Sequence, residues 1–323
     1  MEGKRATIKD VAIASGVTPQ TVSRVFRGKG YVSADTRIKV LDAASKLKYV
    51  PNSAAISLRT GAKKSIAVVF DSLINIYFSV MVDYLQKELQ LNGYNIQTIF
   101  VPSHTINDAT YRDALSLGVS AIISFLEPED SLSGTVRDFG VPLIILGRRS
   151  ELEEFDYITT DDVEGGALAA QKLMRSGCNS FAFLAGGFGM TCVRDRLCGF
   201  SAALKESGFG EPIIIDSTHG VRAAMEKFLE ECELPDGIFC FSDMLAYELL
   251  NILHAGGHSD VKVVGYDNIQ ADIAMPIDLS SVGVDKPAFV KRIVELILDK
   301  IEGRAPGRIA KRMSVELHDG ETA

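Results

Sequence analysis

The stretch TIKDVAIASGVTPQTVSRVF, residues 7–26, decides how the N-terminal part of the chain folds. Thr7, followed three residues later by Asp10, predicts a capped helix start, and the glycine further on predicts the end of that helix. Thr18 then caps a second helix with Pro19 in its first turn, where a missing backbone N–H is tolerated. Two short helices joined by a tight turn that contains glycine are typical of a helix-turn-helix.

The following residues predict a third helix, which completes a small all-α unit. Ser33 suits the N-cap of this helix. Ile38, Leu41, Ala44 and Leu47 recur at helical spacing, so we expect these four side chains to form its buried face.

The second helix carries polar side chains away from its apolar positions. Gln20 suits the edge of an adenine and Arg24 the edge of a guanine, both of which are read in the major groove. Thr7, Thr21 and Ser23 suit phosphate oxygens, which fix the register of a protein on DNA rather than its sequence preference. The solvated face of an ordinary helical bundle is the alternative that this pattern leaves open.

Charge divides the chain into a basic head, residues 1–64, and an acidic body. The head has 13 lysines and arginines against four acidic residues, whereas the body has 21 basic and 38 acidic residues. The net charge of the whole chain is −8, which on its own argues against nucleic acid. A basic head on an acidic body is nevertheless expected when only the head meets phosphate, so the distribution favours DNA binding.

The body alternates short apolar segments with helical ones, which predicts right-handed βαβ units and parallel sheets. The apolar segments are residues 65–70, 95–100, 121–125, 142–146, 181–185, 212–216, 237–241 and 261–267. Because about nine or ten strands are many for one open sheet, we expect two doubly wound α/β lobes. Lobe 1 is expected at about 65–160 plus a returning helix 286–302, and lobe 2 at about 161–285. Residues 308–323 are expected to form one strand and a frayed tail.

Ligands of doubly wound sheets bind outside the carboxyl ends of the strands, so the side chains found there are candidates for a binding site. Arginines, carboxylates and an amide stand beside aromatic rings at these ends, a combination suited to a polyol. The candidates are Asp71, Asn75, Tyr77, Phe78, Arg148, Arg194, Asp195, Arg196, Asp243, Asp267 and Asn268. A single strand-end aspartate can equally cap a helix, and we interpret Asp161 and Asp162 as caps of the helix that follows them.

Residues 7–61 resemble, without a gap, the DNA-binding head of the LacI (lactose repressor) family, through the motifs TIKDVA, TVSRV and YVPN. The resemblance implies that the second helix reads bases through Pro19, Gln20 and Arg24. It also implies that Tyr31 lies in a loop that contacts the DNA backbone.

The same resemblance implies that residues 52–59 form a hinge helix, which folds on operator DNA and inserts Leu58 into the minor groove. We therefore expect a DNA-binding domain at 1–51, a hinge and linker at 52–64, and an effector-binding and dimerisation domain at 65–323. The expected DNA-binding residues are Thr7, Thr18, Pro19, Gln20, Thr21, Ser23, Arg24, Tyr31, Asn52, Ala55 and Leu58.

The body is similar to the effector domain of this family, which itself resembles periplasmic sugar-binding proteins, through NIYF, TTDDVEGG, RDRLCGF, FSDMLA and VVGYDN. The resemblance implies that Arg196 and Asp267 make the main polar contacts with the ligand. Met190 and Cys192 replace residues that are polar in purine-responsive relatives, which argues against a purine. The expected effector-binding residues are Asn75, Tyr77, Phe78, Arg148, Met190, Cys192, Arg196, Asp243 and Asp267.

The resemblance implies a cytoplasmic transcription regulator, which we expect to be a repressor acting as a homodimer on a palindromic operator. We expect a sugar or sugar derivative bound between the lobes to control its DNA affinity allosterically. The identity of this effector, its action as inducer or corepressor, and a dimer against a tetramer remain open.

Two other classes of protein share parts of this pattern. A solute-binding receptor would have the same body, but the chain shows no secretory signal and has a basic head. A sugar kinase or isomerase would need a phosphate loop or paired catalytic acids, whereas the chain lacks a complete GxGxxG, a GxSxG elbow and a CxxC pair. We therefore expect no enzyme activity, no cofactor, no metal and no membrane span.

Overall fold

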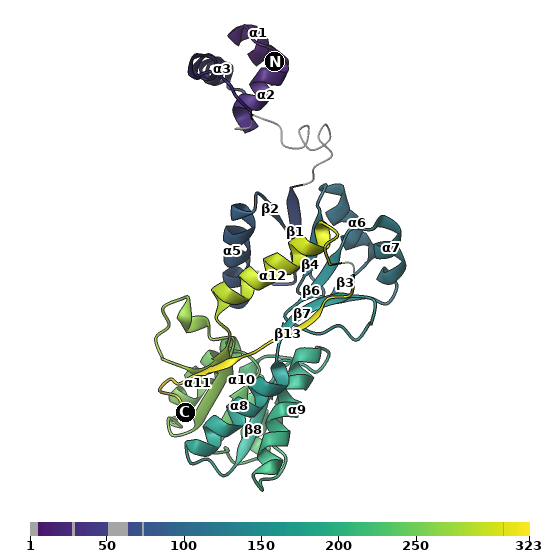
Figure 1. Cartoon of the computed structure of the whole chain (residues 1–323). Helices are drawn as coiled ribbons and strands as arrows, with labels where there is room; N and C mark the ends of the chain where they lie inside the picture. The colour runs from purple at the N-terminus through teal and green to yellow at the C-terminus, as the bar shows by residue number, and fades with distance from the viewer. Residues whose placement is uncertain (1–5, 28–29, 51–63, 73, 306) are drawn as a thin grey trace. The chain divides into compact units, whose positions relative to one another are not determined.

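The computed structural model describes residues 6–27, 30–50, 64–72, 74–305 and 307–323. Contacts divide the chain into two compact units, Met1–Lys63 and Lys64–Ala323, which are drawn in Figure 1. The expected hinge residues Asn52, Ala55 and Leu58 lie outside the described residues.

The first unit contains α1 (Ile8–Ser15), α2 (Pro19–Arg27) and α3 (Ala34–Lys46). The predicted helix starts are confirmed by hydrogen bonds. Thr7 and Asp10 form a reciprocal capping box at α1, and the Thr18 hydroxyl accepts a hydrogen bond from the Thr21 amide at 3.2 Å. Ser33 caps α3 through the amide of Thr36. The local turn chemistry of the sequence is therefore sufficient to set these three helices.

The buried face of α3 agrees with the predicted one only at Ala44. Val40, Ala43 and Ala44 face the core of this unit, whereas Ile38 is 65% and Leu41 is 47% exposed. Leu47, also predicted in the core, is 38% exposed. Two stripes of apolar residues run along this helix at the same helical spacing, and the one with the smaller side chains packs against α1 and α2. The spacing alone did not distinguish between them.

The second unit contains two six-stranded sheets in separate lobes (Figure 1). In lobe 1 all strand pairs are parallel, in the order β13-β7-β6-β4-β1-β2. Its strands are β1 (Ser65–Phe70), β2 (Asn95–Phe100), β4 (Ala121–Ser124), β6 (Leu143–Leu146), β7 (Asp156–Thr160) and β13 (Ala310–Met313). Its helices are α5 (Ile76–Leu91), α6 (Asp108–Ser116), α7 (Leu132–Phe139) and α12 (Lys286–Ile301), and β3 (Thr105–Ile106) pairs with β5 (Glu127–Pro128) beside them.

The sheet of lobe 2 has the order β14-β12-β11-β10-β8-β9 and is parallel except for β14. Its strands are β8 (Phe181–Ala185), β9 (Ile213–Asp216), β10 (Gly237–Cys240), β11 (Lys262–Tyr266), β12 (Ser280–Gly283) and β14 (Glu316–His318). Its helices are α8 (Asp162–Arg175), α9 (Thr191–Glu206), α10 (Val221–Glu231), α11 (Asp243–Gly256) and the short 3₁₀ helix η1 (Ile269–Ala271). The predicted fold class, a helical head followed by two parallel-sheet lobes, is confirmed.

The C-terminal residues correct a prediction, because they form two strands instead of one strand and a frayed tail. β13 adds to lobe 1 beside β7, and β14 adds to lobe 2 antiparallel to β12. The tail is also hydrogen-bonded, since the Thr322 hydroxyl donates to the carbonyl oxygen of Val263 at 2.7 Å. Strands of three and four residues are too short to show a period in the sequence.

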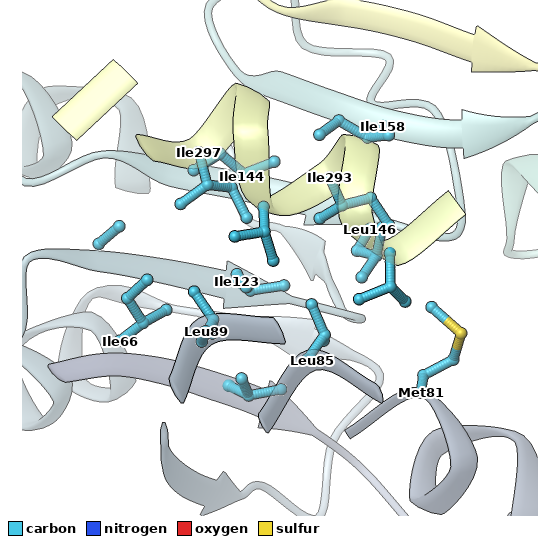
Figure 2. Close-up of a cluster of buried hydrophobic side chains, with 14 of the residues drawn as sticks. Ile66, Met81, Leu85, Leu89, Ile123, Ile144, Leu146, Ile158, Ile293 and Ile297 are labelled. Atoms are coloured by element: carbon cyan, nitrogen blue, oxygen red, sulfur yellow. The ribbon is translucent and has the colours of Figure 1, made fainter. Parts of the chain in front are cut away.

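The core of lobe 1 shows why α12 belongs to this lobe although it follows lobe 2 in the chain. Figure 2 shows Leu85 and Leu89 of α5, and Ile293 and Ile297 of α12, gathered around the apolar side chains of the sheet. All four are fully buried. Burial of apolar side chains of this size is worth roughly 1.5–3 kcal/mol each, so this contact fixes the helix on lobe 1.

Candidate functional site

A cavity of about 270 Å³ lies at the carboxyl ends of strands from both lobes of the second unit. This is where doubly wound sheets bind ligands, and the volume is close to the lower end of ligand pockets, roughly 300–1,000 Å³. The lining residues are Asp71, Ser72, Asn75, Tyr77, Phe78, His104, Phe125, Leu146, Gly147, Arg148, Thr160, Met190, Cys192, Arg196, Phe241, Ser242, Tyr266, Asp267, Gly283 and Val284. Eight of the nine residues expected to contact an effector are among them.

The exception is Asp243, which is fully buried outside the cavity. Its carboxylate accepts hydrogen bonds from the Ser281 hydroxyl at 2.6 Å and from the Ile269 amide at 2.8 Å. Burial raises the pKa of Asp243 to about 8, and the neighbouring Asp267 contributes to this rise. The structure therefore gives Asp243 a supporting position behind the cavity wall instead of a contact with a ligand.

Arg196 is the centre of the cavity wall that lobe 2 provides. Its Nε donates to Asp162 at 2.8 Å and its Nη1 donates to the carbonyl oxygen of Phe241 at 2.5 Å. Its guanidinium carbon lies 3.4 Å from the centre of the Tyr266 ring and 4.8 Å from that of Phe241. Burial alone would lower the pKa of Arg196, but Asp162 and the other neighbours raise it, so the side chain is charged and held in place.

The structure corrects part of our interpretation of the two aspartates at the start of α8. Asp161 does cap the helix, accepting a hydrogen bond from the Glu164 amide at 3.1 Å. Asp162 is instead buried and pairs with Arg196, and the hydroxyls of Thr159 and Thr160 also donate to it. Asp162 stands at a helix start in the sequence, which suggested a cap. Its contact with Arg196 forms only when the lobe folds, because the two residues are 34 positions apart.

Two glycines allow α8 and α9 to meet closely behind this wall. A Cβ at Gly166 would lie 2.0 Å from the carbonyl oxygen of Arg196, and one at Gly199 would lie 1.8 Å from that of Val163. Real Cβ atoms do not approach backbone so closely, so both positions require glycine. The close approach of the helices in turn sets the backbone of Arg196.

Asp267 lies next to Arg196 at the end of β11. Burial raises its pKa to about 7, while the charges of Arg196 and Lys286 lower it. Its backbone has a φ of 107°, a conformation that side chains other than glycine rarely adopt. Strain of this kind at a cavity indicates a position that the surrounding structure holds for function.

Lobe 1 provides a wall of aromatic side chains. The rings of Phe78 and Phe125 lie 4.9 Å apart, and Tyr77 lies 6.0 Å from Phe78 and 6.4 Å from Phe125. Burial and the nearby Asp267 raise the pKa of Tyr77, so its hydroxyl stays protonated. Ring faces of this kind fit the apolar faces of a sugar ring.

Lobe 1 also contributes Arg148, at the end of β6. This arginine is 7% exposed. Within the described part of the chain its guanidinium makes no hydrogen bond or ion pair, and its Nε is buried without an acceptor. It is therefore a buried cation that faces the cavity without a counter-ion.

Side chains on the two lobes also contact each other directly around the cavity. Arg149 donates to both carboxylate oxygens of Asp195 at 2.7 and 3.1 Å. Elsewhere the Tyr84 hydroxyl of α5 donates to Asp272 at 2.7 Å, and Lys286 lies 2.8 Å from the same carboxylate. These contacts hold the lobes at their present separation.

The sequence prediction missed several lining residues. Phe125, Phe241 and Tyr266 each stand at or directly after the last residue of a strand, so the strand-end rule could have found them. His104 is hydrogen-bonded through its Nδ1 to the Asp71 carboxylate at 2.7 Å, across 33 residues of sequence, and no local pattern indicates this contact.

The first unit presents part of the expected DNA-binding set to solvent. Thr7, Thr18, Pro19, Gln20, Arg24 and Tyr31 are exposed, and Thr21 is half-buried. Ser23 is only 4% exposed, so its burial gives no support to a phosphate contact. Gln20 and Arg24 are one helical turn apart on α2, which puts them on one face of that helix.

Two negative findings apply to the described residues. No group of three or more histidines, cysteines, aspartates or glutamates there could hold a metal ion. Among the helices described, none has both the length and the apolar character needed to cross a membrane.

Comparisons with known proteins agree with this architecture. Residues 7–52 match the model described as bacterial regulatory proteins, lacI family, and residues 170–323 match a periplasmic binding protein-like domain. The HTH-type transcriptional repressor PurR of Photobacterium profundum is 26% identical over 324 residues, which cover 97% of each chain.

Two solved structures are similar over nearly the whole chain. The Lac repressor dimer bound to operator and the anti-inducer ONPF has a TM-score of 0.82 at 24% identity, with 99% of each chain covered. The complex of the transcriptional regulator CelR with cellobiose has a TM-score of 0.69 at 25% identity, covering 99% of this chain and 100% of the other.

The helical head, the two-lobed body and the relatives together define a helix-turn-helix transcription regulator, and not an enzyme. Within that class, the chain combines a helix-turn-helix domain of the lacI type with a periplasmic binding protein-like domain.

Proposed function

We propose that the protein is a cytoplasmic transcriptional repressor that binds a palindromic operator as a homodimer. A sugar or sugar derivative in the cavity between the lobes controls its affinity for DNA. Residues 1–51 form the DNA-binding domain, residues 52–64 the hinge, and residues 65–323 the effector domain. The observation that carries this proposal is the combination, in one chain, of an exposed recognition helix and a cavity between two lobes.

The α2 helix supports the DNA-binding half of the proposal. Its exposed Gln20 and Arg24 are the side chains best suited to base edges, and the head around them is strongly basic. The Lac repressor structure that this chain resembles is a dimer bound to operator. A two-fold dimer presents two such helices to two half-sites, which explains a palindromic target.

The cavity supports the effector half of the proposal. It joins the aromatic wall of lobe 1 to the charged wall of lobe 2, which suits a polar ligand with apolar ring faces. CelR, a regulator of similar fold, was solved as a complex with cellobiose. A ligand that contacts both walls changes the balance between lobe arrangements and can therefore change the spacing of the two heads in a dimer.

Replacement of Arg24 tests the DNA-binding half. The operator is first selected from a random duplex library with the full-length protein, and affinities are then measured by fluorescence anisotropy. Arg24→Ala should reduce the preference for operator over random duplex by about 1–3 kcal/mol, because a base contact is lost. Lys39→Ala, which removes the same charge from the exposed side of α3, should weaken both duplexes slightly and equally. An unchanged preference in Arg24→Ala would place α2 outside the groove.

Replacement of Leu58 tests the proposed hinge. Leu58→Ala should weaken operator binding while leaving ligand affinity at its wild-type value, since only the minor-groove wedge is removed. Calorimetry for the ligand and anisotropy for the DNA separate the two effects. Equal losses of both affinities would contradict the hinge assignment.

A further inference from the structure

The cavity contains two buried arginines in opposite circumstances. Arg196 has a carboxylate at 2.8 Å, a carbonyl oxygen at 2.5 Å and two aromatic rings around it. Arg148 lines the same cavity, but no hydrogen bond or ion pair joins its guanidinium to any described residue. A ligand in the cavity therefore lies near one arginine that already has protein partners, Arg196, and one that has none among the described residues, Arg148.

The acidic residues around the cavity do not supply the missing partner. The charge of Asp267 is offset by Arg196 and Lys286. Asp71 is already paired with His104 at 2.7 Å.

Glu127 on β5 is close enough for Arg148 to lower its pKa, although burial raises that pKa overall. Even so, no ion pair between these two side chains is found among the described residues, and the Glu127 Oε2 is itself buried without a hydrogen bond. Among the described residues, the protein therefore supplies no counter-ion for Arg148.

A buried charge without a partner is unfavourable, and proteins keep such groups where a ligand completes them. A guanidinium presents its N–H donors in a planar fork that matches the oxygens of a carboxylate or a phosphate. Sugar hydroxyls alone would leave the charge of Arg148 uncompensated.

We propose that the effector is a polyhydroxylated small molecule with one anionic group, a carboxylate or a phosphate, which Arg148 binds. The hydroxyls of this molecule face Asp267 and Arg196 on lobe 2, and its ring lies against the aromatic wall of lobe 1. The cavity of about 270 Å³ suits a ligand of monosaccharide size. This inference rests on the proposed function, because it identifies the ligand of the same cavity.

Calorimetry on the full-length protein tests the charge of the ligand directly. The probes are D-glucose, D-galactose and D-ribose, each compared with its aldonate and its terminal phosphate ester. In the sugar series that binds, an anionic form should bind about 10- to 100-fold more tightly than the neutral aldose. The aldonate and phosphate arms show which anion the site prefers. A neutral aldose that binds as tightly as both of its anionic forms overturns the inference.

Variants locate the anionic group. Arg148→Gln should weaken the anionic form by about 10- to 100-fold and leave the neutral aldose nearly unaffected, and Arg148→Lys should restore part of the loss. Glu127→Gln is the matched control, because it changes a charge beside Arg148 without removing the proposed anchor, and it should not weaken binding. If Arg148→Gln does not fold, the wild-type affinity for the anionic form should still fall with added salt while that for the aldose does not. Equal affinity losses for both forms in Arg148→Gln overturn the inference.

Operator binding separates this inference from the proposed function. A neutral sugar that binds independently of Arg148 and changes operator affinity overturns the anionic ligand and leaves the effector role intact. An acid that requires Arg148 but leaves operator affinity unchanged supports the anionic ligand and contradicts the effector role.

Discussion

The two walls of the cavity differ in how far the protein satisfies their polar groups. On lobe 2, Arg196 is held by Asp162, a carbonyl oxygen and two rings, and Asp162 in turn accepts from two threonines. On lobe 1, Arg148 lines the same cavity as the aromatic rings but has no hydrogen-bond or ion-pair partner among the described residues. A satisfied network is rigid before a ligand arrives, whereas an unpaired cation gains its partner only on binding. We therefore expect lobe 2 to orient the ligand without rearranging, and lobe 1 to gain a new interaction at Arg148 when the ligand binds.

Removal of the carboxylate on lobe 2 should give the largest loss of stability. Asp162→Asn leaves the Arg196 charge buried without its counter-ion, so the free energy of unfolding should fall by about 3–5 kcal/mol. Urea denaturation followed by circular dichroism measures this. Asp161→Asn is the control, because the adjacent residue caps α8 and asparagine is an equally good cap. Similar losses in both variants would show that the Arg196 pair contributes nothing beyond helix capping.

The next largest effect is expected where α8 and α9 approach each other behind the same wall. Gly199→Ala places a methyl group against the backbone of Val163, so it should destabilise the protein by about 1–3 kcal/mol. Gly134→Ala in α7 is the matched control, since its Cβ meets no atom within 4 Å and alanine favours a helix. The control should be neutral or stabilising in the same denaturation experiment. A Gly199→Ala variant as stable as the wild type would show that the two helices can separate freely.

The third prediction concerns how the stability of the protein depends on pH through Asp267, in the cavity wall of lobe 2. Burial raises the pKa of Asp267 to about 7, so the folded protein binds this proton more tightly than the unfolded chain. Its contribution to stability is therefore present at low pH and is lost as the pH rises from about 4 through 7. Asp267→Asn removes this dependence, and the variant should gain stability relative to the wild type from pH 5 to pH 8, with a slope of at most about 1.4 kcal/mol per pH unit.

Thermal denaturation at pH 5, 6, 7 and 8 measures this difference. Asp243, whose pKa is raised to about 8, acts in the same direction, so Asp243→Asn should flatten the wild-type curve up to a higher pH. Parallel curves for the wild type and Asp267→Asn would mean that the Asp267 carboxyl group titrates as it does in the unfolded chain.

The same comparison shows what could be predicted from the sequence. Helix caps such as Thr7 and Ser33 act within a few residues, so their chemistry is visible in the sequence and the structure has the same helices. Strand ends mark the edge where a ligand binds, which is why residues as distant as Asn75 and Asp267 were placed together correctly in one cavity.

The partners within the cavity could not be predicted in this way. Arg196 is 34 residues from Asp162, and whether such a pair forms depends on the close packing of α8 on α9. The absence of a partner for Arg148 among the described residues is likewise a property of the whole wall, which no local pattern encodes. The buried face of α3 was missed for a related reason, because two apolar stripes compete and only packing against α1 and α2 decides between them.

The smallest effect is expected for Arg148 in the ligand-free protein. Arg148→Gln removes a buried charge that has no counter-ion among the described residues, so it should change the free energy of unfolding by less than about 1 kcal/mol and in the stabilising direction. Arg196→Gln, which removes a similarly buried but paired guanidinium and leaves Asp162 without its partner, should instead destabilise the protein, by an amount several times larger in size. Urea denaturation of both variants without ligand measures the contrast. A large loss of stability in Arg148→Gln would mean that the protein itself supplies a partner for this cation. The two walls would then not differ in how far their polar groups are satisfied before a ligand binds.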